Sequence, residues 1–367
     1  MTKELIRSYI FVFVFTLLLT FFITPIIKYI VEKKRLFDLP FSKRKIHRRP
    51  IGRLGGIAFA FSFLLAMIIT YLFNAKFNSA ITFERFQGFI VGLLTIVLLG
   101  VVDDIYDLPA IFKLIFQILI GMMLYYFNFT TEVITNPISG ETIAVPPLLN
   151  LIFTILWTVA IMNAINLIDG LDGLAASLSI IASFTLFIFA INRANIDIVS
   201  SFICLALAGS LTGFIKYNLP PAEIFMGDCG SLFIGYVLAV IGLIGFNKSS
   251  TAMTLLIPIA SLTIPISDTI IAIIRRSMRK KRIFDADKEH IHHRLLNIGL
   301  SDRQVLIILI IISLYFSIIS LLMINLSKQA SLILFILMLI SIIILLSFLK
   351  KIEIRFYLKK KSSNNGQ

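Results

Sequence analysis

The sequence has little cysteine and little charge, and both shortages narrow the class of protein. Two cysteines in 367 residues are too few for a disulfide framework, which excludes the small disulfide-rich secreted folds. Charged residues make up 15% of the chain, whereas an ordinary soluble domain carries about 25%. The charges lie between long apolar runs. These runs are continuous rather than alternating, which excludes a transmembrane β-barrel.

Apolar residues make up 58% of the chain and gather in runs long enough for membrane-spanning helices. The sequence predicts an all-α polytopic membrane protein with about eleven transmembrane helices. Residues 1–349 are expected to form one integral-membrane catalytic domain. A basic polar cytoplasmic tail, 350–367, follows and is expected to be disordered from Lys359 onward. The predicted spans are 8–30, 53–73, 86–102, 111–129, 148–166, 174–192, 197–216, 230–246, 253–274, 304–326 and 330–349.

Lysine and arginine are distributed unevenly around these runs, and this sets the expected topology. Nine lie in 31–53, nine in 275–303 and six in the tail, and Lys113 and Lys216 bring this face to 26 of the 34. We therefore expect this face to be cytoplasmic, with the N-terminus outside and the C-terminus inside. The net charge of +14 is then mainly a topology signal. Anionic membrane lipids are expected as partners, and nucleic acid is not.

Three aspartates, Asp103, Asp104 and Asp107, follow the third run on the cytoplasmic face. Carboxylates beside a bilayer are costly unless they pair, bind metal or line a wet cavity. Asp104 and Asp107 are three residues apart, so a helical end would place both on one face, and carboxylate oxygens suit Mg²⁺. A solvated acidic loop is the alternative. Lys113 follows at a depth from which it could hold a phosphate, unless it is an ordinary cytoplasmic-side anchor.

Four polar residues are spaced three apart at the end of the fifth run and just after it: Asn163, Asn166, Asp169 and Asp172. On a continuous helix they would form one polar stripe. Such a stripe is costly against lipid, so it is expected to line a cavity or bind a ligand. Interhelical hydrogen bonding is the alternative reading.

A third polar segment, from Phe225 to Asp228, precedes the eighth run. Gly227 and Gly230 flank Asp228, so a ligand could approach both the backbone and the carboxylate closely. Phe225 could offer a ring face to a base, although interface packing is the ordinary role in a chain with 33 phenylalanines. Asn218 helps to shape the loop before it.

A fourth segment holds three of the four histidines, His290, His292 and His293. Their spacing fits no structural zinc site, and phosphate pairing or proton transfer fits better. A solvated basic loop is the alternative. Asp268 lies within the ninth run, where a buried carboxylate needs a partner. Pro258 and Pro265 are expected to kink that helix.

Taken together, these motifs resemble the polyprenyl-phosphate N-acetylhexosamine-1-phosphate transferase family. They are Asp-Asp-x-x-Asp at 103–107, Asn-x-x-Asn-Leu-x-Asp-Gly-x-Asp-Gly at 163–173 and Phe-Met-Gly-Asp-x-Gly-Ser at 225–231, preceded by 47–50 and by Arg-Leu-Gly-Gly at 53–56. The ending His-Ile-His-His-Arg at 290–294 is similar to the WecA/TagO-type branch. The MraY-type branch has three consecutive histidines followed by Phe. That difference argues against UDP-MurNAc-pentapeptide as the donor.

The resemblance implies transfer of a HexNAc-1-phosphate, GlcNAc by default, from a UDP-N-acetylhexosamine to undecaprenyl phosphate, releasing UMP. The reaction would start a cell-envelope glycan, such as teichoic acid or lipopolysaccharide, at the bacterial cytoplasmic membrane. The resemblance also implies Mg²⁺, with Mn²⁺ as the alternative, and a homodimer. The implied catalytic residues are Asp103, Asp104, Asp228, His290, His292 and His293. The implied metal ligands are Asp228 and Asn166, and the implied substrate contacts are Lys113, Asn163, Asp169, Asp172, Asn218 and Phe225.

Two other functions compete with this one. An intramembrane prenyltransferase also uses Mg²⁺ and Asp-rich motifs, but it needs only two such motifs and fewer spans, and it releases pyrophosphate. A transporter would place ionisable residues near the bilayer midplane, whereas these motifs lie at one interface. For the transferase itself, both direct attack by the lipid phosphate and a covalent aspartyl intermediate stay open, and direct attack is favoured because the acceptor is already anionic.

Overall fold

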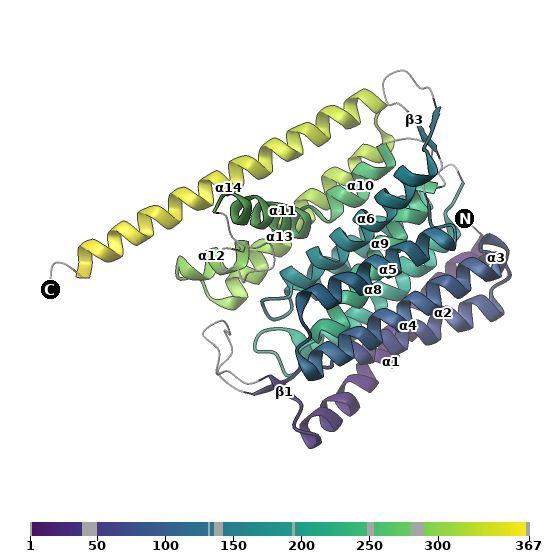
Figure 1. Cartoon of the computed structure of the whole chain (residues 1–367), viewed down its shortest axis with the longest axis horizontal. Coiled ribbons are helices and arrows are strands. Elements are labelled where there is room, and N and C mark those ends of the chain that lie inside the picture. The colour runs from purple at the N-terminus through teal and green to yellow at the C-terminus, as the bar shows by residue number, and fades with distance from the viewer. Residues whose placement is uncertain are drawn as a thin grey trace.

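The computed structural model describes residues 2–38, 50–130, 133–135, 142–192, 195–247, 253–279 and 290–364. Within these ranges the protein is almost entirely helical (Figure 1). Several segments named above lie outside the described residues: part of the first basic loop with His47, part of the outer loop at 130–147, part of the second basic loop and residues 365–367.

Eight helices in the described part of the chain are long and apolar enough to cross a membrane. They lie side by side in a bundle (Figure 1). They are α1 (Lys3–Lys33), α2 (Gly56–Phe73), α4 (Phe83–Tyr106), α6 (Pro147–Ile168), α7 (Leu174–Ile191), α8 (Ile198–Asn218), α9 (Gly227–Asn247) and α13 (Asp302–Leu322).

Shorter elements complete the chain. α5 (Ala110–Tyr126) and the first half of α14 (Lys328–Asn364) are also apolar. Two small antiparallel pairs join β1 (Phe37–Asp38) to β2 (Ile51–Gly52) and β3 (Val133–Thr135) to β4 (Thr142–Ala144). The remaining helices are α3 (Ala75–Ala80), α10 (Met253–Ser261), α11 (Thr263–Met278), α12 (Ile291–Asn297) and the 3₁₀ turn η1 (Met323–Asn325).

The centre of the bundle is formed by α8 and α9, which are apolar on all sides and almost fully buried. α8 packs against α1 and α7, and α9 packs against α4 and α6. Small residues permit these contacts: a Cβ on Gly209 or Gly213 of α8 would collide with the carbonyl oxygens of Phe13 or Leu17 on α1.

The outer faces of the bundle are apolar. Exposed side chains include Phe22 of α1, Leu98 of α4, Leu148 of α6 and Ile311 of α13. A water-soluble protein would not leave such continuous apolar helix faces bare, whereas lipid covers them without cost. The protein is therefore a multi-pass membrane protein.

Ten of the eleven predicted apolar runs match one described helix each, and the ninth does not. Run 253–274 is divided at Leu262 into α10 and α11. Pro265 lacks the N–H that would donate to the carbonyl of residue 261, so the series of helical backbone hydrogen bonds is interrupted at this point. The predicted interruption is confirmed, and the run does not form a single straight span.

The expectation of a disordered tail from Lys359 is wrong for the described residues, because α14 continues as far as Asn364. A helix started by the apolar segment propagates at low cost through lysine, glutamate and isoleucine, which are acceptable helix residues. Figure 1 shows α14 diverging from the bundle toward the C-terminus.

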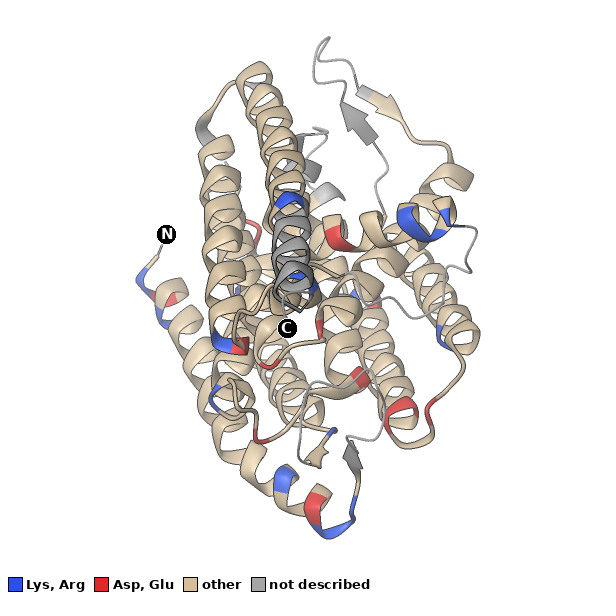
Figure 2. Ribbon diagram, turned by 90° about the vertical axis from the view of Figure 1, so that its left-hand side faces the viewer, with Lys and Arg blue, Asp and Glu red and all other residues tan. Residues whose placement is uncertain are grey.

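The ends of several helices converge on one side of the bundle. There α4 and α6 end and α9, α12 and α13 begin. Figure 2 looks toward this side and shows most charged residues on helix ends and turns, while the helix shafts carry few charges. The motifs found in the sequence are therefore gathered by the bundle, although up to about 240 residues separate them in the chain.

Candidate active site

The start of α9 is held by an aspartate from α4. The carboxylate of Asp104 accepts hydrogen bonds from the backbone N–H groups of Asp228 (2.8 Å) and Cys229 (3.0 Å). These N–H groups have no partner within the helix, so a carboxylate from a neighbouring helix caps them. Gly100 makes the approach possible, because a Cβ there would collide with the backbone of Cys229. Asp104 thus positions Asp228.

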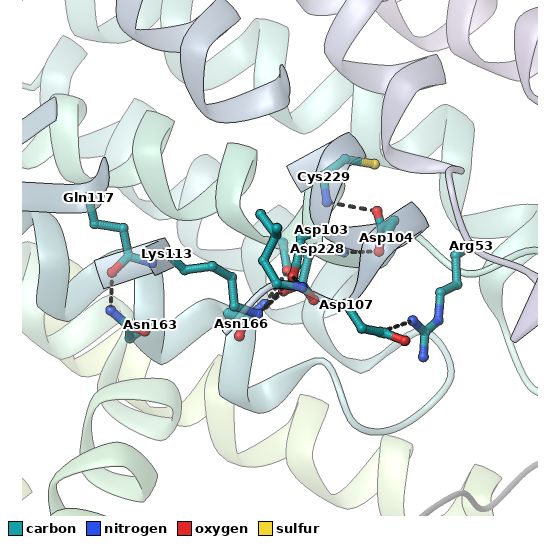
Figure 3. Close-up of polar contacts among 12 residues, drawn as sticks. Arg53, Asp103, Asp104, Asp107, Lys113, Gln117, Asn163, Asn166, Asp228 and Cys229 are labelled. Atoms are coloured by element: carbon teal, nitrogen blue, oxygen red, sulfur yellow. Dashed lines mark hydrogen bonds and ion pairs between the residues drawn. The ribbon is translucent and has the colours of Figure 1, made fainter. Parts of the chain in front are cut away.

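Asp103 and Asp228 share one lysine. The Lys113 ammonium donates to Asp103 Oδ2 and to Asp228 Oδ2, at 2.7 Å each (Figure 3). The other oxygen of Asp103 accepts from the backbone N–H of Leu108 at 2.8 Å. Because Asp107 ends α4 in the left-handed conformation, α5 starts almost at once and brings Lys113 back over the two carboxylates.

The predicted four-residue stripe is only half correct. Asn163 and Asn166 lie on α6, but the helix ends at Ile168, and Asp169 and Asp172 lie in the turn that follows. The backbone leaves the helical conformation at Asp169 (ψ 47°), before the stripe is complete, and Gly173 with φ +73° then precedes the first residue of α7.

The two asparagines form hydrogen bonds within the helix bundle. Asn163 donates to Gln117 Oε1 at 2.6 Å and to the Val159 carbonyl at 2.8 Å, which matches the interhelical alternative. Asn166 donates to Ser231 Oγ at 2.9 Å and also interacts with the Asp228 carboxylate. Asn166 therefore stands close to the proposed metal ligand, whereas Asn163 stands away from it (Figure 3).

The turn after α6 is fixed to the loop before α9. Asp172 accepts from the backbone N–H of Ala222 at 2.9 Å. Buried Asn218 accepts from Gly173 N–H at 3.1 Å and donates to the Ile224 carbonyl at 3.0 Å. Burial raises the pKa of Asp169 well above its usual value, and the nearby carboxylates of Asp228, Asp104 and Asp172 raise it further.

The Phe225 segment is paired with the residues before α2. Phe225 N–H donates to the Gly52 carbonyl at 2.8 Å, and Gly55 N–H donates back to the Phe225 carbonyl at 2.9 Å. Gly56 N–H donates to the Met226 carbonyl at 2.9 Å. A Cβ on Gly56 would collide with the backbone of Gly230, so this pairing depends on glycine.

The three histidines occupy different environments. His290 Nδ1 lies 2.8 Å from Asp268 Oδ2, and the other oxygen of Asp268 accepts from Ile291 N–H at 3.0 Å. His292 is buried against Gly170, and neither of its ring nitrogens has a hydrogen-bond partner among the described residues. Asp268 has thus found the partner it needs in His290, which sequence spacing did not reveal.

These segments enclose one cavity of about 440 Å³. It is lined by nine of the predicted site residues: Asp103, Asp104, Lys113, Asp169, Asp172, Asn218, Phe225, Asp228 and His293. Four predicted residues are not among the described lining residues, namely Asn163, Asn166, His290 and His292, although Asn166 contacts the lining residue Asp228. A helix or loop directs only some of its polar side chains to one side, and for this reason residues adjacent in a motif are separated here.

Arg53, Asp107 and Asp302 also line the cavity and were not predicted as site residues. Asp107 was noted for its three-residue spacing from Asp104 but was given no role, and Arg53 was noted only as part of a quoted motif. Asp302 is the first residue of α13, and no sequence pattern connects it to the others. Seven aspartates and two strongly basic residues, Arg53 and Lys113, thus face the cavity among its described lining residues.

The burial of His292 gives a testable pH dependence. Desolvation, with smaller effects from His293 and His290, lowers the pKa of His292 to about 3. The unfolded chain, with a histidine pKa near 6.5, binds more protons than the folded protein between these values. Stability is then present above about pH 6.5 and falls by up to about 1.4 kcal/mol per pH unit as the pH decreases toward 3.

We expect His292→Leu to flatten this acid slope, measured as the thermal unfolding midpoint in detergent from pH 8 to pH 4. His293 lies at the cavity, only partly buried, so His293→Leu is the matched control that should keep the slope. Equal slopes in wild type and His292→Leu would show that His292 does not stay neutral.

Comparison with known proteins agrees with the motifs. A "probable undecaprenyl-phosphate N-acetylglucosaminyl 1-phosphate transferase" of Bacillus subtilis is 38% identical over 323 residues, which cover 87% of this chain and 86% of the relative. The profile described as glycosyl transferase family 4 matches residues 86–246. This chain belongs to that family. The matched region contains the three aspartate motifs and ends before the histidine segment.

Two further relatives show which kind of transferase within the family this chain resembles over more of its length. An "undecaprenyl-phosphate alpha-N-acetylglucosaminyl 1-phosphate transferase" of Thermotoga maritima is 29% identical over 83% of this chain and 87% of its own length. A "phospho-N-acetylmuramoyl-pentapeptide-transferase" of Enterococcus faecalis is 36% identical, but over only 52% of this chain and 60% of its own. Similarity to the first kind of transferase extends over much more of the chain.

Proposed function

We propose that this enzyme transfers N-acetylglucosamine 1-phosphate from UDP-GlcNAc to undecaprenyl phosphate and releases UMP. The lipid-linked product would start a cell-envelope glycan, teichoic acid or lipopolysaccharide being the candidates. One observation carries the proposal: Lys113 joins Asp103 and Asp228 at 2.7 Å each, inside the cavity where the aspartate motifs and His293 meet. Relatives with this activity in their names align with most of the chain.

The donor set favours Mg²⁺, with Mn²⁺ as the alternative. A cavity lined by seven aspartates would repel a diphosphate unless a cation offset the charge. Carboxylate and amide oxygens are the ligands that Mg²⁺ prefers, and Asp228 with Asn166 beside it supplies both. No cluster of three or more His, Cys, Asp or Glu side chains suited to a metal occurs among the described residues, so a hydrated ion held by few protein ligands fits best. Such an ion would neutralise charge on the diphosphate.

The reaction needs few proton transfers. An oxygen of the lipid phosphate attacks the β-phosphorus of the UDP-sugar, and the bond from that phosphorus to the bridging oxygen of UMP breaks. Since a phosphate monoester has a second pKa near 6, the attacking oxygen is already anionic at neutral pH, and direct attack is preferred to a covalent aspartyl intermediate. Lys113 would hold the attacking phosphate against Asp103, and Phe225 would stack on the base.

The polar neighbours of these groups take supporting roles. Asp104 holds the start of α9, and Asn218 fixes the loops on both sides of the cavity. His290 and His292 are not among the described lining residues and would position His293, which lines the cavity. The cavity would open toward the cytoplasm of a bacterial cell, where UDP-sugars are made, because the flanking loops carry most of the lysine and arginine.

The test is UMP release by the purified protein in detergent, given undecaprenyl phosphate and UDP-GlcNAc with and without Mg²⁺. We expect release that depends on both acceptor and metal. UMP from a different UDP-sugar would change the donor and keep the reaction. Folded protein that releases no UMP from any UDP-sugar would contradict the proposal and favour the prenyltransferase or transporter. UMP–UDP-sugar exchange without the acceptor would indicate a covalent intermediate.

A further inference from the structure

Arg53 reaches the cavity from the side opposite to Lys113, and the reaction scheme above does not use it (Figure 3). Its Nη1 donates to Asp107 Oδ1 at 3.2 Å. The Asp107 side chain is 89% exposed at the rim, whereas that of Arg53 is 27% exposed. Asp107 therefore holds the guanidinium at the mouth of the cavity without burying it.

The backbone on both sides of Arg53 is fixed to the Phe225 segment. Gly52 pairs with Ile224 as a parallel bridge and accepts from Phe225 N–H, and Gly55 donates to the Phe225 carbonyl. These bonds lie one residue before and two residues after Arg53. Arg53 and Phe225 therefore face the same cavity from one rigid unit.

Lys113 belongs to a different side of the cavity. Its helix, α5, exposes Ile111, Phe112 and Ile115 on the outer surface, so Lys113 is the cation next to the lipid-facing wall. Its ammonium is already shared between two carboxylates. Two phosphate-bearing substrates must meet in this cavity. Among its described lining residues, the two strongly basic ones, Arg53 and Lys113, lie on its two sides.

We propose that Arg53 binds the diphosphate of the nucleotide-sugar donor. A guanidinium presents a planar fork of N–H donors that matches phosphate oxygens, which an ammonium does not. The donor's base would meet Phe225, and its phosphates would reach the guanidinium held beside the same segment. Lys113 then remains for the acceptor phosphate. This assignment rests on the proposed transferase function and divides the two cations between the two substrates.

The experiment compares binding of UDP-GlcNAc, UMP and uridine to wild type and Arg53→Gln in detergent with Mg²⁺, by displacement of labelled UDP-GlcNAc. We expect Arg53→Gln to weaken the binding of UDP-GlcNAc and UMP by about tenfold to a hundredfold, since charged hydrogen bonds are lost. The affinity for uridine should not change. Arg53→Lys should recover part of the loss, because it restores the charge without the fork. The KM for undecaprenyl phosphate should stay within about twofold of wild type.

Lys28→Gln is the matched control. Lys28 forms a partly exposed ion pair with Glu223 at 2.6 Å and does not line the cavity, so its loss removes one positive charge without affecting the donor. Unchanged donor affinity in Arg53→Gln would overturn the assignment. So would an equal loss for uridine, which indicates a damaged pocket, or a loss confined to the lipid acceptor. Failure of the folded wild type to bind UDP-GlcNAc would overturn the proposed function together with the assignment.

Discussion

Replacing Asp228 with asparagine is expected to lower the rate of UMP release by roughly a hundredfold to a thousandfold, the usual effect of removing one preorganised charge-stabilising group. Asparagine has nearly the same shape, and Asp104 bonds to the backbone of residue 228 rather than to its side chain. The start of α9 should therefore stay in place. What is lost is a carboxylate that Lys113 shares with Asp103 and that would hold Mg²⁺. The measurement is kcat for UMP release, with thermal unfolding recorded alongside it.

Asp197→Asn supplies the matched control. Like Asp228, Asp197 lies at a helix start, where it is buried and accepts from Ser200 N–H and Ser200 Oγ, but it lies at the far end of α8 from the cavity. Asparagine caps helices about as well as aspartate, so this variant should keep its activity. Near-wild-type kcat in Asp228→Asn would exclude Asp228 from the reaction.

Replacing Asp268 with alanine is expected to destabilise the protein by about 3 kcal/mol and to reduce activity with it. Asp268 is buried and bonds to His290 Nδ1 and to Ile291 N–H, so alanine leaves two buried polar groups without a partner. It also releases the start of α12 from α11, and with it the segment that presents His293 to the cavity. The unfolding midpoint in detergent measures the first effect, and kcat measures the second.

Asp268→Asn should lose much less stability, because its carbonyl oxygen can still accept from Ile291 N–H. A double-mutant cycle with His290→Ala separates the pair from its surroundings, and a coupling above about 0.5 kcal/mol is expected for residues in contact. An Asp268→Ala protein with the stability and kcat of wild type would show that this pair does not hold the histidine segment.

The sequence alone determined the class of protein and the chemistry of its polar segments. Long continuous apolar runs can satisfy their backbone in lipid only as helices, so the helical membrane architecture follows from hydropathy. Carboxylates beside such runs are costly unless they pair, bind metal or line a wet cavity. This cost singled out the aspartates at 103–107 and Asp228. The break in the ninth run followed from Pro265, whose missing N–H acts locally.

Only the tertiary structure decided which polar side chains face the cavity. Asp103 and Asp104 are neighbours in the chain, yet one meets Lys113 and the other caps α9, because consecutive helical residues point about 100° apart. The Asn163 side chain hydrogen-bonds to Gln117, and the His290 ring hydrogen-bonds to Asp268. Arg53 and Asp302 line the same cavity although they belong to distant segments of the chain. These outcomes depend on how helices pack against one another, and no pattern within a single segment carries that information.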